Sequence, residues 1–381
     1  MMAAVFWIGV ALIGYAYVGY PFAVWLLARF KPSPPVDSEA DWPSVSLIVA
    51  AFNEEQVIGG KLINALSLDY PLGRLEVIVA SDGSTDGTDE IADGFRSRGV
   101  RLVRLEGRQG KTATQNAAAA AATGEILVFS DANALYEADA IRRLVQHFSR
   151  EDVGCVEGRR ADFASDASAT ARHELTYRDM ESWIKTWESR VLSCTGATGP
   201  IYAVRRSLYL PLDPAMISDF MEPLLVMCRH GKRQVFEPAA ISRECVLGEL
   251  RDEFHRKVRI MTRCLNSLRM APEVLSPLRT GWFAVQVISH RLLRWLVPVL
   301  ALAVFTANVF LLPHPFYRVT LLLQASFLLV AAIGAALDRL DVGPGFLRLP
   351  HYFCAANMAA LDALGNCLLG RNIVTWRTHR A

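Results

Sequence analysis

The chain has 381 residues, of which 52% are hydrophobic and 20% charged, and part of that apolar content is expected to face lipid. Its formal net charge of +2 excludes a global polyanion-binding surface, so nucleic acid is not expected as a partner. The seven scattered cysteines form no CxxC pair, which argues against a zinc site and against a disulfide framework.

The first segment of the chain is almost wholly apolar from residue 3 to residue 28. At about 1.5 Å per residue such a helix spans a bilayer of roughly 30 Å. The run is too long, and lacks the positive n-region, for a cleaved signal peptide. Arg29 and Lys31 follow it and place its C-terminal end in the cytoplasm. Residues 1–30 are therefore predicted to be a transmembrane helix, and residues 31–270 a cytoplasmic domain.

Within the predicted cytoplasmic domain, buried strand-like runs alternate with helical runs. This alternation predicts an α/β fold of Rossmann-like type, with a mostly parallel sheet covered by helices on both faces. No GxGxxG or GxxxxGK[ST] motif is present, so the phosphates of a nucleotide would be held by a metal or by side chains. The expected strands cover 45–51, 75–80, 100–105 and 125–129, and the expected helices cover 53–68, 88–98 and 111–123.

Three polar motifs follow three of these strands directly. They are AFNEE at 51–55, SDGSTD at 81–86 and SDAN at 130–133. In open α/β sheets, ligands bind beyond the carboxyl ends of the strands. The three motifs are therefore predicted to form one binding site.

The C-terminal part contains two further long apolar runs within residues 296–337. Basic residues, including Arg294 and Arg339, flank the pair, which predicts a transmembrane hairpin with both ends in the cytoplasm. Residues 271–295 are amphipathic and are predicted to lie at the membrane interface. Residues 338–381 are predicted to form a hydrophobic or interfacial helix with a basic tail. Together these segments predict a multi-pass protein of the inner or plasma membrane.

In this order and spacing, the motifs resemble those of family 2 glycosyltransferases of the GT-A fold. The likeness is to membrane polysaccharide synthases of the hyaluronan, cellulose and poly-N-acetylglucosamine type, and it covers nearly the whole chain. It implies a nucleotide-sugar donor, with UDP as the expected nucleotide, and a saccharide or lipid-linked acceptor. It also implies an inverting transfer in exopolysaccharide or cell-envelope glycan synthesis.

The resemblance also assigns donor-binding residues. The first-strand motif of the family lines the nucleotide base, the SDGSTD aspartate reads uracil and ribose, and the GK…N stretch lies beside the donor. Two structural alternatives stay open: Ser84 or Thr85 caps the next helix, and the lysine is simply solvated. The corresponding residues here are Ala51, Asn53, Glu54, Asp82 and Lys111.

Asp131-Ala132-Asn133 stands where the family carries its DxD motif. A carboxylate at this position lets a divalent cation, Mg²⁺ or Mn²⁺, bridge the diphosphate and stabilise the leaving nucleotide. The amide oxygen of Asn133 can also coordinate such a cation, but it adds no charge. Asp131 and Asn133 are therefore the expected metal ligands, and Asp131 is also expected to contact the donor.

The catalytic base is expected at Asp219, because Ile217-Ser218-Asp219-Phe220 stands where the family has its TED or DD motif. A carboxylate there takes the proton of the acceptor hydroxyl. Glu222, one turn further, is the alternative carboxylate, and a helix N-cap is the structural alternative for Asp219. Gly196 and Gly199 belong to a segment that resembles the acceptor side of the family.

Processive members of the family carry QxxRW where this chain has Arg256 to Ile260, and only Arg259 matches. Arg256, Arg259 and Arg263 share one helical face, which could hold the donor diphosphate. The alternative is a basic face on anionic lipid, above all for Lys257 and Arg263. The missing Trp removes a platform for the acceptor sugar, so processivity is not predicted.

Two other functions fit parts of the sequence. A polyprenyl-phosphate glycosyltransferase shares the sheet motifs but usually lacks the N-terminal membrane helix. A nucleotide-sensing scaffold on a degenerate glycosyltransferase fold would suit Asn133 and the incomplete QxxRW motif. The few membrane crossings leave little material for a channel, so a polymer product would require a homodimer or an export partner.

Overall fold

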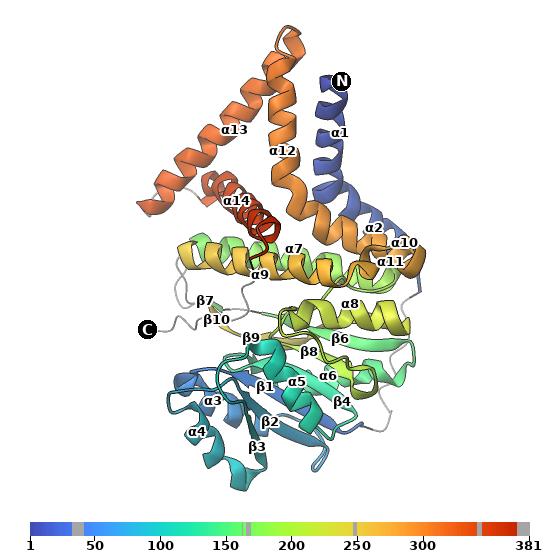
Figure 1. Cartoon of the computed structure of the whole chain (residues 1–381), viewed down its shortest axis with the longest axis vertical. Coiled ribbons are helices and arrows are strands. Elements are labelled where there is room, and N and C mark those ends of the chain that lie inside the picture. Colours follow the sequence, from blue (N-terminus) through green and yellow to red (C-terminus); the bar gives the residue numbers. More distant parts are fainter. Residues whose placement is uncertain (33–41, 162, 165–168, 247–249, 341–344, 372–381) are drawn as a thin grey trace.

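The computed structural model describes residues 1–32, 42–161, 163–164, 169–246, 250–340 and 345–371. An α/β body lies at one end of the molecule, and long helices formed by both ends of the chain rise from it (Figure 1). Helices α7 (Ala169–Val191) and α9 (Leu250–Met270) lie between these two parts. The sequence-based division into an N-terminal transmembrane helix, a cytoplasmic domain and C-terminal membrane segments stays a prediction.

The body is built on an eight-stranded mixed sheet with the order β3-β2-β1-β4-β8-β6-β9-β5. Strands β1, β2, β3 and β4 pair in parallel, as do β6 and β9, whereas β8 and β5 pair antiparallel to their neighbours. The predicted mostly parallel α/β sheet is therefore confirmed. The strands are β1 (Val45–Ala51), β2 (Leu75–Ser81), β3 (Val100–Arg104), β4 (Ile126–Asp131), β5 (Leu135–Tyr136), β6 (Val153–Arg160), β8 (Tyr202–Arg205) and β9 (Arg233–Arg243). A separate pair joins β7 (Phe163–Ala164) to β10 (Cys245–Val246).

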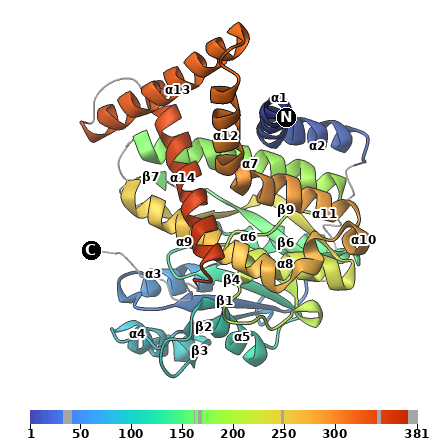
Figure 2. The same cartoon turned by 45° about the horizontal axis from the view of Figure 1, so that its top comes forward.

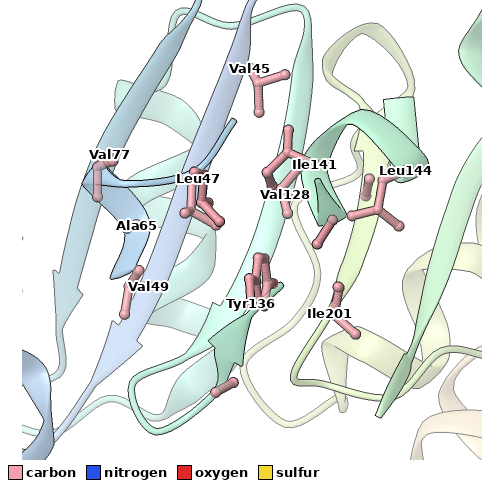
Figure 3. Packing of buried hydrophobic residues seen from close by; sticks show 14 of the residues in the cluster. Val45, Leu47, Val49, Ala65, Val77, Val128, Tyr136, Ile141, Leu144 and Ile201 are labelled. Carbon is pink, nitrogen blue, oxygen red and sulfur yellow. The ribbon is translucent and has the colours of Figure 1, made fainter. Parts of the chain in front are cut away.

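Both faces of the sheet are covered, which explains why β1 is buried along its whole length. Val45, Leu47 and Val49 point to one face, where they pack with residues of α3 (Glu55–Leu66) and α6 (Ala140–Val145) (Figure 3). Ile48 points to the other face and packs with residues of α5 (Lys111–Ala121) and α8 (Ser218–His230). This alternation follows the two-residue period of a strand.

The four expected strands and three expected helices are present. The expected helix 88–98 is shorter, since α4 (Thr88–Gly94) is followed by a 3₁₀ turn (Arg96–Arg98) and by Gly99 with φ +89°. Glycine accepts this left-handed conformation without strain, so it ends the helical stretch before β3. The strands after β4 were not predicted.

Within the described residues, three helices are long and apolar enough to cross a membrane: Met2–Arg29, Trp282–Phe310 and Pro315–Arg339. The first comprises α1 (Met2–Gly14), a π turn (Tyr15–Gly19) and α2 (Tyr20–Arg29). The second comprises α11 (Trp282–Val287), a π turn (Ile288–Leu292) and α12 (Leu293–Phe310), and the third is α13. Phe6 of α1 packs against Val304 and Ala307 of α12. These helices support membrane association.

The segment 271–295 is not one continuous helix. It contains a 3₁₀ turn (Pro272–Leu275) and α10 (Pro277–Thr280), and the membrane-length helix begins after Gly281, which has φ +58°. Phe283 is buried in a cluster with residues of α8 and α9, whereas Leu278 and Trp282 are exposed. A position at the membrane interface stays a prediction for the exposed side of this segment.

The last described helix is α14 (Leu349–Leu368), which lies across α9 (Figure 2). It is not among the three helices that could cross a membrane. Ala363 and Cys367 of α14 pack against Leu265 of α9. An interfacial rather than spanning helix therefore stays the prediction for this segment, and most of the predicted basic tail lies outside the described residues.

Candidate active site

The loops after β1 and β2 are joined by side-chain hydrogen bonds. The backbone N–H of Asn53 donates to Ser84 Oγ (3.2 Å), and the N–H of Thr85 donates to Asn53 Oδ1 (2.9 Å). The N–H of Glu54 donates to Thr88 Oγ1 (2.7 Å), and Glu54 is buried. Asn53 has φ +52°, a left-handed conformation that Asn tolerates better than most residues. The AFNEE and SDGSTD motifs thus form one ordered rim, and Ser84 and Thr85 stabilise this rim across the two loops.

Asp82 is fully buried and organises the next loop. Its own N–H donates to the carbonyl of Ala51 (2.9 Å) at the end of β1. Its carboxylate accepts from the backbone N–H groups of Gln109 (2.8 Å) and Gly110 (3.0 Å). Charge-assisted bonds of this kind are among the stronger hydrogen bonds in proteins. Asp82 therefore fixes the entry to α5 and to Lys111, and its predicted contact with uracil and ribose stays a prediction.

A substitution at Gly83 tests whether the rim contributes to stability and to donor binding. It has φ +69°, and a Cβ added there would lie 2.5 Å from the carbonyl oxygen of Gly107. Gly83→Ala is expected to lower the free energy of unfolding by about 1–3 kcal/mol and to weaken donor binding. Thermal unfolding and nucleotide titration measure the two effects. Gly94→Ala, where nothing lies within 4 Å of the added Cβ, is the matched control, and equal losses in both variants would contradict the prediction.

Four chain segments meet at Gly199. A Cβ placed there would lie 2.6 Å from Asp219 Oδ2, 2.7 Å from Lys111 Nζ and 3.5 Å from Asp131 Oδ2. Lys111 is the first residue of α5, Asp131 the last of β4, and Asp219 lies in the first turn of α8. The Lys111 amine contacts Asp131 Oδ1 directly. Any Cβ at position 199 would displace the Asp219 and Lys111 side chains, so the convergence requires a glycine. We call Lys111, Asp131 and Asp219 the reaction centre.

The pKa values of the two carboxylates in this centre are shifted in opposite directions. Burial pushes the pKa of Asp131 up, but the positive charges of Lys111, Arg160 and Lys61 and the hydrogen bond from Lys111 together hold the pKa below its ordinary value. Burial raises the pKa of Asp219, and the negative charge of Asp131 adds to this against the opposing pull of Lys111 and Arg263. Such a separation is the usual basis for assigning different roles to two carboxylates in one site. Asp131 is suited to remain an anion, and Asp219 is suited to accept a proton.

The N-terminal part of α8 contains both Asp219 and Glu222, the two carboxylates considered for the catalytic base. Ile217, not Asp219, occupies the N-cap position, so the helix-cap alternative for Asp219 is not what the structure has. Glu222 is fully buried, accepts the N–H of Leu210 (2.9 Å), and burial raises its pKa to about 8. Its charge acts on Tyr202 and Tyr209, whereas Asp219 Oδ2 lies 2.6 Å from the position of a Cβ at Gly199. Asp219 is thus the α8 carboxylate that borders the centre.

The three arginines that share one face of α9, Arg256, Arg259 and Arg263, have different environments. Arg256 pairs with Glu253 (2.8 Å), so any binding of a diphosphate by Arg256 would compete with this ion pair. Arg263 is buried and donates to the carbonyl of Met216 (2.7 Å), so the expectation that Arg263 touches lipid is wrong. Arg259 makes no hydrogen bond or ion pair within the described part of the chain, and Asp131 acts on its charge. Arg259 is therefore the arginine of this set best placed to bind an anion.

Sequence reasoning missed several charged residues around Asp131. Glu244 follows β9, is buried, and pairs with Arg160 at the end of β6 (2.7 Å). Burial and the charge of Asp131 raise the pKa of Glu244. Lys61 of α3 is fully buried beside the ring of Tyr136, and burial lowers its pKa to about 7. These residues lie on unpredicted strands or on a helix face that had only an apolar pattern, so no motif could have identified them.

The predicted metal ligands can be tested by their chemistry. Asp131 offers a carboxylate and Asn133 an amide oxygen, which suit Mg²⁺ or Mn²⁺. No group of three or more His, Cys, Asp or Glu that could hold a metal occurs among the described residues. The protein ligands therefore fit a cation that is also held by the phosphates of the donor.

Part of the α/β body matches a known family model. Residues 46–210 match the model of Glycosyl transferase family 2. A beta-monoglucosyldiacylglycerol synthase from Synechocystis sp. is 38% identical over 128 residues, which cover 32% of this chain and 27% of that protein. An N-acetylglucosaminyltransferase from Bradyrhizobium diazoefficiens is 27% identical over 281 residues, which cover 68% of this chain and 57% of that protein. The chain thus spans less than two thirds of these curated relatives.

One solved structure is similar over nearly its full length. A mannosyltransferase from Pyrobaculum calidifontis, in complex with GDP-Man and Mn²⁺, matches with a TM-score of 0.73 and 22% identity. The match covers 98% of this chain and 100% of that chain. The predicted GT-A fold, with long apolar helices at the N-terminus and in the C-terminal region, is therefore confirmed.

Proposed function

Since residues 46–210 match the model of Glycosyl transferase family 2, we propose that the protein is an inverting membrane glycosyltransferase of this family. It moves a sugar from a nucleoside-diphosphate donor, with UDP as the expected nucleotide, to a saccharide or lipid-linked acceptor. The observation that carries this proposal is the convergence of Lys111, Asp131 and Asp219 at Gly199. The product would belong to an exopolysaccharide or a cell-envelope glycan, with the catalytic domain in the cytoplasm.

In the proposed reaction, Asp219 accepts the proton of the acceptor hydroxyl as its oxygen attacks the anomeric carbon. The bond between that carbon and the diphosphate oxygen breaks, and the nucleoside diphosphate leaves with the electron pair. A divalent cation held by Asp131 and Asn133 would supply positive charge to the diphosphate. Lys111 and Arg259 are placed to bind the phosphates, while Asn53, Glu54 and Asp82 shape the rim proposed to receive the base.

In a second version of this proposal, the acceptor of the sugar is a membrane lipid. The segment from Thr195 to Gly199 borders Asp219 at one end, and Arg291 of a membrane-length helix binds its other end (3.0 Å to Thr195 O). An acceptor hydroxyl carried by a membrane lipid could therefore approach Asp219 from this side. The similarity to enzymes that make beta-monoglucosyldiacylglycerol supports the same form.

The test is a donor panel on the full chain in lipid nanodiscs. Radiolabelled UDP-glucose, UDP-N-acetylglucosamine and GDP-mannose are supplied with Mn²⁺, with native membranes and diacylglycerol vesicles as acceptor sources. Thin-layer chromatography and gel sizing then separate glycolipid, polyprenyl-phosphate sugar and polymer. Transfer from one donor supports the proposal. Nucleotide binding without transfer from any donor would instead favour the nucleotide-sensing scaffold.

A further inference from the structure

A buried polar network lies where two membrane helices meet α7. Glu188 of α7 is fully buried, and the hydroxyl of Tyr20 donates to its carboxylate. His290 Nδ1 lies 2.8 Å from Glu188 Oε1, and Thr195 Oγ1 donates to Glu188 Oε2 (3.3 Å). The carboxylate of Glu188 therefore joins the N-terminal membrane helix, the second membrane helix and the segment after α7. The residues of this membrane-side network are Tyr20, Glu181, Glu188, Thr195, His290, Arg291 and Arg294.

Glu181 provides the second carboxylate of the network and contacts the basic side chains in it. Glu181 pairs with Arg291 (3.0 Å), with Arg294, and with His290 Nε2 (3.2 Å). Burial works against ionisation of Glu181, but these charges hold its pKa well below the ordinary value. Apolar packing holds helices together at least as well as buried ion pairs do. A network of this kind is therefore poorly explained by anchoring alone, and it fixes orientation instead.

Both membrane helices reach this network through a π turn. Tyr15 in the first π turn contacts Ser289 in the second, with 3.0 Å between the two hydroxyl oxygens. Arg294 Nε donates to the carbonyl of Ala16, which lies within the first π turn (3.4 Å). π turns break the regular helix ladder and often mark functional sites. Here they turn the polar side chains of two apolar helices towards α7.

The segment Thr195–Gly199 connects the network to the reaction centre. At its first residue, Arg291 Nε donates to Thr195 O (3.0 Å). In its middle, the N–H of Ala197 donates to the carbonyl of Asp219 (3.0 Å). The N–H of Thr198 donates to the buried carboxylate of Glu157 (2.8 Å), and Gly199 borders the Asp219 carboxylate. Five consecutive residues thus contact a membrane helix at one end and the candidate base at the other.

We infer that Thr195 is a positioning residue through which the two membrane helices set the acceptor side of the reaction centre. Glu188 and Arg291 hold Thr195, and the segment it begins fixes the backbone beside Asp219. The role of Asp219 rests on the proposed function, whereas the mechanical coupling of the segment to the membrane helices does not. The coupling should affect sugar transfer and leave donor binding intact, because the nucleotide rim is formed by the loops after β1 and β2.

Tyr20→Phe and Thr195→Val in the full chain in nanodiscs test the inference, because each removes one hydroxyl at nearly constant shape. Both are expected to speed amide exchange in the peptide covering Thr195–Gly199 by about tenfold, with β1 and β2 unchanged. With the donor that the wild type uses, kcat should fall about tenfold, while titration with UDP and Mn²⁺ stays within about twofold. Thr195→Ser keeps the hydroxyl, so its amide exchange and its kcat should both stay close to the wild-type values.

The matched controls are Tyr352→Phe and Thr186→Val. Tyr352 bonds Asp338 (2.7 Å) on neighbouring C-terminal helices, and the Thr186 hydroxyl bonds only the Ser182 carbonyl (2.8 Å) among the described residues. Unchanged exchange and kcat in Tyr20→Phe would overturn the inference, even if Thr195→Val failed to fold. Equal effects in the controls would overturn it too. Faster exchange in a chain that transfers no sugar would keep the coupling and contradict only the proposed function.

Discussion

Asp219→Asn is expected to lower kcat by about 100- to 10,000-fold, the range over which a positioned general base accelerates a reaction. Asparagine keeps the shape of the side chain and cannot take the acceptor proton. The hydrogen bond that the Ala197 N–H donates to the Asp219 carbonyl does not depend on the carboxylate, so the segment beside it should stay in place. The affinity for UDP with Mn²⁺ should change by less than about threefold, as nucleotide titration would measure.

The pH dependence of the wild type tests the same assignment. Burial and the charge of Asp131 raise the pKa of Asp219, so its proton-accepting form is lost as pH falls through a value above the ordinary one for aspartate. The acid limb of kcat should therefore lie at a higher pH than an ordinary aspartate would give, and it should be absent from the residual activity of Asp219→Asn. A raised pKa also means that ionising Asp219 destabilises the folded state above that pKa. At neutral pH the variant should accordingly unfold at the same or a higher temperature than the wild type.

A nearby aspartate provides the control for this substitution. Asp213 is exposed, and its carboxylate accepts the N–H of Ala215 (2.8 Å) in the segment that precedes α8. Asp213→Asn changes the same charge without touching the centre at Gly199, so its kcat should remain within about twofold of the wild type. Wild-type kcat in Asp219→Asn would transfer the role of base to another group, and loss of UDP binding would indicate a structural defect.

Local sequence signals were sufficient for the first half of the sheet. The runs from Val45 to Phe129 alternate apolar strands with helices, and three of the four strands end in a polar motif. The order of the strands along the chain and the edge that carries the site therefore both follow from short-range patterns. Asp131 and Lys111 could be placed together because parallel neighbours share an edge. They come into direct contact because Asp131 is the last residue of β4 and Lys111 is the first residue of α5.

The second half of the sheet depends on contacts distant in sequence. Strands β6, β8 and β9 are ordered 8-6-9 in the sheet, so no local pattern reveals which charged residues they bring to Asp131. Glu244 reaches the site because β9 pairs with β6, and Arg160 meets it there. The membrane-side network was invisible for a similar reason. Glu188 lies in a helix that was not predicted, and His290 lies in a segment predicted to be interfacial, so only the tertiary structure places them together.

The largest effect on donor binding is expected from Asp131→Asn. The variant loses the anionic ligand proposed for the cation, so Mn²⁺ should no longer strengthen UDP binding, and kcat should fall by at least about 100-fold. It also leaves the Lys111 amine without its carboxylate partner, which lowers stability because a partly buried charge becomes uncompensated. A nucleotide titration with and without Mn²⁺ separates these effects, since a general loss of stability would weaken binding in both conditions.

Two further variants, Lys111→Met and Asn133→Asp, test whether Asp131 and Asn133 bind the cation. In the free protein, Lys111 and a cation compete for Asp131, because the amine already contacts Oδ1. Lys111→Met should therefore bind Mn²⁺ more tightly in the absence of nucleotide, as the free Mn²⁺ electron paramagnetic resonance signal would measure, although its kcat should fall. Asn133→Asp adds the second charge of a DxD motif and should strengthen Mn²⁺ binding by about tenfold. If neither variant bound Mn²⁺ more tightly than the wild type, Asp131 would be a partner of Lys111 alone, and the diphosphate would have to be neutralised by Lys111 and Arg259.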